Sequence, residues 1–386
     1  MKILVFTYEY PPVGGGGGRV AQDICWGLVK HGHDVRVLTT HWGELPSTEV
    51  QNGVHIQRVS TGRKLSYRAG FMDMGRYIPA SVLAARRTIR DWRPDILHVH
   101  FAVPSGPAAW VISKMSGIPY VLTAHLGDVP GGVPQKTKHW FRLVLPFTPP
   151  IWQDAARVAA VSEFTRILAI KHYAVPIEVV PNGVNLDLLD PGEIRANAVP
   201  RIVFAGRFMT QKNPIQIVRT LANLRDLPWE CVMLGDGPLK ADVEEEISRL
   251  KLTDRFFLSG WVTPDQVIDW YRKSDILFMP SRSEGLPVAG VQALSMGLAL
   301  VLSRVGGCGD LIEQGKNGFL LDRDDLVGFE ESMKIILSDP EKLQACRVAS
   351  RQLAAKFDTE IVVESYVKIF TEVVQGNNAL RPEENM

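Results

Sequence analysis

The chain has 386 residues, 46% of them hydrophobic and 22% charged, which is typical of folded globular proteins and predicts two or three domains rather than one. The formal net charge of +1 excludes a strongly basic nucleic-acid binder, so nucleic acid is not among the partners we expect. Charge is uneven: residues 1–190 hold 20 basic and 14 acidic residues, whereas 191–386 hold 23 and 28, which suggests two halves with different partners.

The first half opens with a buried strand, a glycine loop, a helix and a second strand. Lys2–Thr7 is an apolar run, a Pro/Gly loop follows it at 11–18, and Val20–Lys30 has apolar residues at helical spacing. His33–Thr39 alternates as a strand does. This order predicts a doubly wound α/β domain. Its further predicted elements are the strand Asp95–His100, the helix Ala108–Ser116 and the strand Tyr120–Ala124.

The second half repeats this order after a segment rich in proline. A strand at Ile202–Ala205 leads into the polar loop 206–213 and a helix that opens at Pro214, since proline is favoured at the first helical position. We therefore predict a first domain at 1–185, a second at 186–375 and a frayed tail at 376–386. Two amphipathic helices are predicted between Pro340 and Val374. The elements predicted in between are the strands Cys231–Leu234, Phe256–Leu258, Ile276–Met279, Leu300–Leu302 and Phe319–Leu321 and the helices Pro214–Leu224, Pro264–Arg272 and Pro287–Met296, with another ending at Leu250.

The cysteines and the N-terminus indicate a cytoplasmic protein. Four cysteines without a Cys-x-x-Cys pair predict neither a disulfide framework nor a zinc site, and we expect reduced thiols. The N-terminal apolar run, Ile3–Phe6, is too short for a signal peptide, and no apolar stretch is long enough to span a membrane.

Two loops carry groups suited to an anion. Gly14–Gly18 separates the first strand from the first helix, so Gly15 and Gly16 can offer backbone N–H groups at the positive end of that helix. A flexible loop without a ligand is the alternative. Arg207 and Lys212 bracket the turn after the strand Ile202–Ala205, a placement that suits a diphosphate, although two solvated surface charges would give the same pattern.

The segment 280–301, PSRSEGLPVAGVQALSMGLALV, places Glu284 just before a helix, where the helix dipole favours a carboxylate or a bound phosphate. This segment resembles the E-x7-E signature of the retaining glycosyltransferases of family 4, also called group 1 glycosyl transferases, which have the GT-B fold. The resemblance covers about residues 1–375. The other segments that carry it are YEYPPVGGGGGRVAQDICWGLVKHGHDVRVLT, DILHVH, VLTAHLGD, VVPNGVNLDLL, AGRFMTQKNP, MLGDGP, FLSGWV and VGGCGDLIEQGKNGFLL.

The resemblance implies an α/β GT-B fold: two Rossmann-like, doubly wound domains facing across a cleft, with C-terminal helices. It implies retaining transfer of a hexose-type sugar from a nucleotide-diphosphate sugar (UDP- or GDP-linked) to a hydroxyl acceptor, a lipid-linked or growing cell-surface glycan, without metal or cofactor. The implied catalytic residues are His125, Glu284, Arg207 and Lys212. The implied donor-binding residues are Gly15, Gly16, Arg207, Lys212, Trp261, Glu284, Gly285, Leu286, Pro287 and Gln292, and the implied acceptor-binding residues are Gly15, His100 and His125.

Two positions depart from the family's pattern. The second glutamate of E-x7-E is Gln292, which keeps one acceptor oxygen but lacks the charge of a carboxylate. Because that carboxylate accepts hydrogen bonds from the ribose in the family, we expect weakened or reoriented donor binding. Residues 306–310 read Gly-Gly-Cys-Gly-Asp where the family has Gly-Gly-Ile-Pro-Glu.

Three histidines stand near the predicted ligand. By the resemblance His125 faces the transferred sugar, although a lone loop histidine is more often structural. His98 and His100 alternate on a predicted strand, and we expect them to face opposite sides, with His100 nearer the cleft mouth. A purely structural role fits His100 as well.

A membrane surface is a further expected partner. Residues 131–152 mix Lys136, Lys138 and Arg142 with aromatic side chains, a pattern suited to an anionic membrane interface on the inner leaflet. A second basic group, placed on a helix, comprises Arg86, Arg87, Arg90 and Arg93. An amphipathic helix with a solvated face is an equally good interpretation.

Other function classes stay open. A GT-B-fold sugar-nucleotide epimerase would act without an acceptor, and a non-catalytic nucleotide-sugar-binding protein has Gln292 as its only support. A nicotinamide dehydrogenase predicts an acid about 20 residues past the glycines. We discount it because no acid follows the second strand before Glu44.

Overall fold

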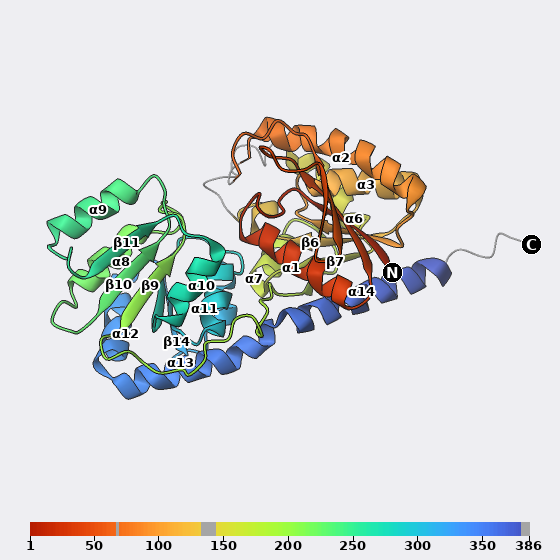
Figure 1. Cartoon of the computed structure of the whole chain (residues 1–386). Helices are drawn as coiled ribbons and strands as arrows, with labels where there is room; N and C mark the ends of the chain where they lie inside the picture. The colour runs from red at the N-terminus through yellow and green to blue at the C-terminus, as the bar shows by residue number, and fades with distance from the viewer. Residues whose placement is uncertain (67–68, 133–143, 380–386) are drawn as a thin grey trace, which may run out of the picture. The chain divides into compact units, whose positions relative to one another are not determined.

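The computed structural model describes residues 1–66, 69–132 and 144–379, which pack into two compact units (Figure 1). The first unit is Met1–Gly183 with the C-terminal helix α14 (Thr359–Ala379), and the second is Val184–Asp358. Each unit is a sheet between two layers of helices, so the predicted pair of doubly wound α/β domains is confirmed. We describe each unit by itself.

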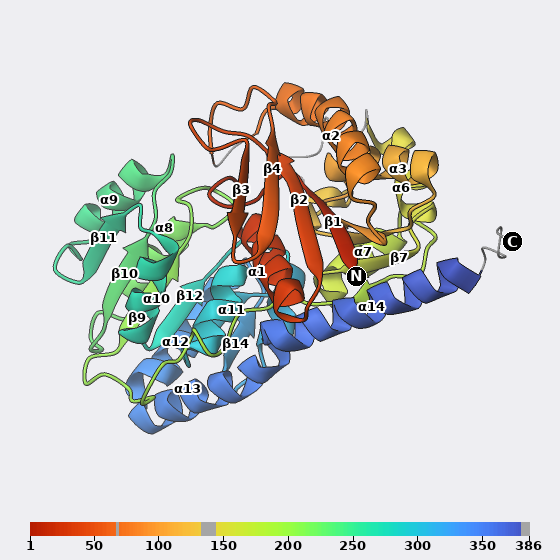
Figure 2. The same cartoon turned by 45° about the vertical axis from the view of Figure 1, so that its right-hand side comes forward.

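The first unit holds an eight-stranded sheet in the order β3-β4-β2-β1-β5-β6-β7-β8, all parallel except β3 against β4 (Figure 2). The central strands are buried on both faces, which explains their unbroken apolar runs. The elements are β1 (Lys2–Thr7), α1 (Gly16–Lys30), β2 (Asp34–Thr40), β3 (Thr48–Gln51), β4 (Val54–Val59), α2 (Phe71–Asp91), β5 (Ile96–His100), α3 (Ser105–Ser116), β6 (Tyr120–Ala124), η1 (Leu126–Asp128), η2 (Leu145–Phe147), α6 (Pro149–Gln153), β7 (Arg157–Ala160), α7 (Glu163–Ile170) and β8 (Glu178–Val179).

Helix α14 runs beside α1 on one face of this sheet, while α2 and α3 pack together on the other (Figures 1 and 2). The two helices approach so closely that a Cβ on Gly27 of α1 would lie 2.3 Å from Val363 of α14. The two tail helices are confirmed, but only α13 packs on the second unit. Our assignment of both to a domain at 186–375 therefore does not match the packing, because Val363, Tyr366 and Phe370 are buried in the first unit. Helical structure continues to Ala379, and 380–386 lie outside the described residues.

The second unit is a six-stranded parallel sheet in the order β11-β10-β9-β12-β13-β14. Its strands alternate between two apolar clusters: Ile202 and Phe204 pack towards α8, α9 and α12, and Val203 and Ala205 towards α10 and α11. The elements are β9 (Arg201–Ala205), α8 (Pro214–Ala222), β10 (Glu230–Leu234), α9 (Lys240–Arg249), β11 (Phe256–Gly260), α10 (Pro264–Arg272), β12 (Ile276–Met279), α11 (Val288–Ser295), β13 (Ala299–Ser303), η3 (Gly306–Leu311), β14 (Gly318–Leu321), α12 (Leu326–Ser338), α13 (Pro340–Ala354) and η4 (Ala355–Phe357).

Candidate functional site

In the second unit the candidate site is built from loops that leave the carboxyl ends of three neighbouring strands. The loop 206–213 follows β9, the loop 280–287 follows β12, and the loop 304–305 follows β13. Ligands of doubly wound α/β folds bind at this end of the sheet, because loops from adjacent strands converge there. The strand order thus places the first loop beside two loops that begin about 70 or more residues later in the sequence.

An ion pair joins the first two loops. Lys212 Nζ lies 2.6 Å from Glu284 Oε1, and the Glu284 side chain is 7% exposed. The loops are further held by Gln211, whose Nε2 donates to the carbonyl of Ser283 at 2.9 Å and whose carbonyl accepts the N–H of Arg282 at 2.7 Å. Cation and carboxylate therefore sit at fixed positions beside the start of α11, and the sequence-predicted residues Lys212 and Glu284 are in direct contact.

The two glycines that follow the third loop pack against the backbone of Glu284 and Gly285. Gly307 N–H donates to the Gly285 carbonyl at 2.5 Å, and Gly306 has a φ of +55°. A Cβ on Gly306 would lie 1.6 Å from the Glu284 carbonyl oxygen, so only glycine allows this approach. The sequence Gly306–Asp310, which departs from the family's pattern, lies in the 3-10 helix η3 and keeps a glycine at position 306, where the backbone requires it.

The other predicted donor residues occupy different positions around this pair. Arg207 is half-buried in the loop after β9, Leu286 and Pro287 are buried, and Pro287 caps α11. Gln292 is half-buried on α11, and among the described residues no hydrogen bond joins its side chain to Glu284. Trp261 follows β11, the edge strand of the sheet, and its side chain is 73% exposed.

In the first unit the glycine run forms the N-terminus of α1, with Gly15 as its N-cap. The chain's own Glu9 already binds there: Gly15 N–H donates to Glu9 Oε2 at 2.9 Å, and a Cβ on Gly14 would collide with the Glu9 side chain at 2.5 Å. The buried Arg63 lies 4.0 Å from the same carboxylate. A ligand anion at Gly15 and Gly16 would therefore compete with the Glu9 carboxylate. Glu9 was not among the predicted site residues.

His125 lies just after β6 and next to the glycine run. Its side chain is buried, its ring stacks on Phe101 at 4.3 Å, and burial lowers its pKa to about 4, so it is neutral near pH 7. Its backbone N–H donates to Asp128 Oδ2 at 2.9 Å. A Cβ on Gly17 would lie 3.5 Å from His125 Nδ1. Phe101 and Asp128 were not predicted; their position at the carboxyl ends of β5 and β6 is the only signal that could have pointed to them.

The expectation that His98 and His100 face opposite sides is wrong. Residues two apart in a strand share a face, and the two rings lie 4.3 Å apart. His100 is fully buried, with Nδ1 3.3 Å from His125 Nε2. It therefore stands behind His125 rather than at a surface where an acceptor could touch it.

The predicted membrane segment is only partly visible. Lys136, Lys138 and Arg142 lie outside the described residues, so the structure says nothing of their arrangement. Arg86, Arg87 and Arg90 lie exposed on α2, but Arg93 follows the end of that helix. Among the described residues no helix is long and apolar enough to cross a membrane.

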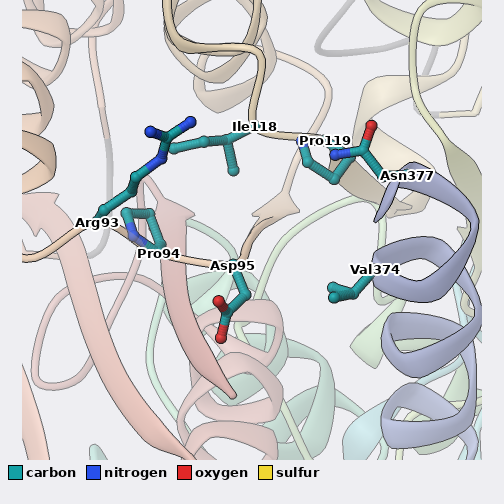
Figure 3. A pocket seen from close by; sticks show the side chains of 7 residues that line it. All are labelled: Arg93, Pro94, Asp95, Ile118, Pro119, Val374 and Asn377. Carbon is teal, nitrogen blue, oxygen red and sulfur yellow. The ribbon is translucent and has the colours of Figure 1, made fainter. Parts of the chain in front are cut away.

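The described residues also contain no group of three or more His, Cys, Asp or Glu side chains that could hold a metal ion. A small cavity of about 160 Å³ lies at the amino ends of β5 and β6, the opposite end of these strands from His100 and His125 (Figure 3). It is therefore separate from the candidate site. Its lining residues are Arg93, Pro94, Asp95, Ile118, Pro119, Val374 and Asn377.

Comparison with known proteins gives two adjoining family matches. Residues 14–188 match Glycosyltransferase Family 4, and residues 192–353 match Glycosyl transferases group 1. Among curated proteins the chain is similar to the putative teichuronic acid biosynthesis glycosyltransferase TuaC of Bacillus subtilis (strain 168), with 29% identity over 348 residues that cover 83% of this chain and 85% of the relative.

Solved structures agree on the fold. Sucrose-phosphate synthase from Thermosynechococcus elongatus matches with a TM-score of 0.83 and 18% identity over 97% of this chain and 99% of that one. Anabaena HepE in complex with UDP-glucose matches with a TM-score of 0.76 and 16% identity over 96% of this chain and 100% of that one. The expected two-domain GT-B fold is thereby confirmed.

Proposed function

Because this chain belongs to the glycosyltransferases, with a family 4 domain followed by a group 1 domain, we propose that it transfers a hexose-type sugar from a nucleotide-diphosphate sugar to a hydroxyl group. The acceptor we propose is a lipid-linked or growing cell-surface glycan, and the transfer retains the anomeric configuration. The single observation that carries the proposal is the Lys212–Glu284 ion pair at the carboxyl ends of β9 and β12, beside Arg207.

The second unit is the proposed donor site. Breaking the anomeric C–O bond releases a diphosphate that gains negative charge, so cations fixed beforehand stabilise the transition state without reorganising. Arg207 and Lys212 are the proposed cations, since both leave the same loop after β9. The solved structure of HepE with UDP-glucose supports a nucleotide sugar as donor, and we propose a uridine or guanosine nucleotide.

Glu284 has two proposed tasks. Its Oε1 holds the Lys212 ammonium at 2.6 Å, which fixes a flexible side chain in one place. Its carboxylate also provides acceptor capacity for sugar hydroxyls. We propose that Leu286, Pro287 and Gln292 line the nucleotide beside it, with Trp261 as a stacking surface.

The first unit is the proposed acceptor side. We propose that His125 contacts the transferred sugar and that Gly15 borders the acceptor. Attack by the acceptor hydroxyl on the same face as the leaving group gives retention, and the leaving diphosphate accepts the proton of that hydroxyl. No step uses a metal ion. Exposed Arg86, Arg87 and Arg90 with Leu83 on α2 support contact with an anionic inner leaflet of the cytoplasmic membrane.

A panel of UDP- and GDP-sugars in thermal unfolding tests the donor. We expect one nucleotide class to raise the melting temperature, because a ligand that binds only the folded state stabilises it by mass action. The best donor is then incubated with glycan and lipid-linked acceptors, with and without EDTA, while nucleoside diphosphate release is measured.

Each outcome separates the alternatives. Acceptor-dependent release that survives EDTA supports the proposal. Interconversion of the sugar without an acceptor identifies an epimerase, binding without release identifies a binding protein, and no stabilisation by any nucleotide sugar refutes the donor site.

A further inference from the structure

Three buried histidines form a line inside the first unit. His98 and His100 lie on β5 with ring centroids 4.3 Å apart, and His100 and His125 have ring centroids 5.6 Å apart. The polar contact between the last two joins His100 Nδ1 to His125 Nε2 at 3.3 Å. His98 and His100 have no exposed surface, so water does not reach either ring.

The C-terminal helix closes the inner end of this line. His98 Nε2 lies 2.9 Å from Thr123 Oγ1, which lies 2.9 Å from the Tyr366 hydroxyl on α14. The rings of Tyr366 and Phe370 also pack on His98, with centroids 4.8 and 5.1 Å away. The line is therefore anchored at one end by α14 and ends at the other in His125, beside the glycine run.

The partners of the ring nitrogens decide where the protons lie. Burial lowers the pKa of all three histidines, to about 3 for His98 and about 4 for His125, so each ring is neutral and carries one N–H. Within the described residues His98 Nδ1 and His100 Nε2 are buried without a partner. A proton on either would leave a donor unpaired, which is rarer in proteins than an unpaired acceptor. His100 therefore carries its proton on Nδ1.

We propose that His100 is a positioning residue, which donates its Nδ1–H to Nε2 of His125 and thereby fixes the proton of His125 on Nδ1. His125 then presents an N–H donor beside the first turn of α1, where its Nδ1 would lie 3.5 Å from a Cβ on Gly17. The stacked ring of Phe101 holds the plane of this donor.

As a consequence, His125 selects a substrate oxygen that accepts a hydrogen bond. A Nδ1–H donor stabilises a substrate oxygen that accepts, such as a sugar hydroxyl, and cannot take a proton from an attacking hydroxyl. This last step rests on the proposed function, whereas the tautomer itself does not.

The tautomer is measured by long-range 1H–15N NMR on the full-length protein with 15N-labelled histidine, with His125→Asn used to assign the signals. We expect a protonated Nδ1 and a bare Nε2 for His125. In His100→Val the donor is absent, so the His125 signals should move towards the Nε2–H form or towards exchange between both forms. His100→Asn places an amide where Nδ1 stood and should restore the wild-type pattern more fully than valine does.

Each result decides the matter. A wild-type His125 protonated on Nε2, or a Nδ1–H pattern unchanged in His100→Val, overturns the proposal. Should His100→Val fail to fold, the wild-type spectrum still tests the tautomer and His100→Asn tests its cause. With an active donor, kcat should fall about tenfold in His100→Val and recover partly in His100→Asn. If no nucleotide sugar is a substrate, the proposed function fails while the NMR result stands on its own.

Discussion

Replacing Gly306 by alanine should displace Glu284 from Lys212 in the proposed donor site while leaving the sheet intact. Gly306 has a φ of +55°, and its Cβ would lie 1.6 Å from the Glu284 carbonyl oxygen and 2.6 Å from the Glu284 carbonyl carbon. These atoms belong to the backbone, so a side-chain rotation cannot relieve the collision. The loop 280–287 must move and must take the Glu284 carboxylate with it, away from Lys212.

The size of the effect follows from this geometry. A carbon and a carbonyl oxygen normally stay about 3.3 Å apart, so the alanine variant requires a shift of about 1.7 Å. Misplacement by about 1 Å can cost about 100-fold in rate. A left-handed alanine costs about 1–2 kcal/mol and overpacking about 1–3 kcal/mol. At about 2–4 °C per kcal/mol, a loss of about 3 kcal/mol lowers the melting temperature by about 6–12 °C.

The assay combines thermal unfolding with steady-state kinetics over donor concentration. Gly309→Ala, in the same 3-10 helix, is the matched control, because its nearest neighbour would be a methyl carbon of Leu320 at 3.8 Å. We expect the control to keep the wild-type melting temperature and donor KM. A Gly306→Ala protein with unchanged melting temperature and donor KM would refute the reasoning. The backbone would then accommodate the methyl group without displacing Glu284.

Four further predictions follow from other parts of the structure. Gln292→Glu restores a second carboxylate and should lower the donor KM about tenfold in kinetic titrations, because a carboxylate accepts hydrogen bonds more strongly than an amide. Arg207→Ala should lower kcat about 100-fold, and Arg207→Lys should recover part of the rate. Gly17→Ala places a Cβ 2.7 Å from the ring of Phe101 and should lower kcat by shifting that ring. Burial lowers the pKa of His98 to about 3, whereas His98 in the unfolded chain gains a proton below about pH 6.5. The free energy of unfolding should therefore fall by about 1.4 kcal/mol per pH unit from about pH 6.5 towards pH 3. Denaturant titrations from pH 7 to 5 should detect this loss, and His98→Gln should reduce it.

Controls and contrary outcomes differ among these predictions. Gly75→Ala on α2 has no neighbour within 4 Å of its Cβ and should keep full activity, unlike Gly17→Ala. An unchanged KM in Gln292→Glu would place residue 292 away from the nucleotide. A rate in Arg207→Ala within a few-fold of wild type would mean that this arginine does not stabilise the leaving diphosphate. A pH slope unchanged in His98→Gln would mean that other groups cause the acid sensitivity.

Local sequence patterns were enough for the elements that place the site. Continuous apolar runs such as Ile276–Met279 can only be buried strands or short buried helix segments, and the loop residues after them fix their ends. The helix after the glycine run begins at Gly16 rather than Val20, because glycine lacks the side chains on which helical periodicity is measured. The hairpin of β3 and β4 was missed although Asn52-Gly53, both with positive φ, is a strong hairpin signal.

Contacts between distant segments could not be predicted in this way. The sequence near Lys212 does not predict that Glu284 is its partner, because only the strand order brings β9 beside β12. Glu9 at the Gly15 N–H depends on how the chain turns after β1. Position 306 requires glycine because the backbone of Glu284 passes next to it. Such a close approach of two backbone segments cannot be read from a sequence pattern.

Helix α14 also sets the order in which the protein can be completed during synthesis. Domains generally fold as units as the chain emerges, the N-terminal one first. Here the first unit waits for residues that are synthesised after the whole second unit, because Val363, Tyr366 and Phe370 cover its sheet. Until then His98 and the facing surface of α1 stay uncovered, whereas Val184–Asp358 is already complete. A chain that stops before Thr359 leaves the ribosome with a complete second unit and a first unit whose sheet face stays exposed. That exposed apolar face is a target for chaperones and proteases.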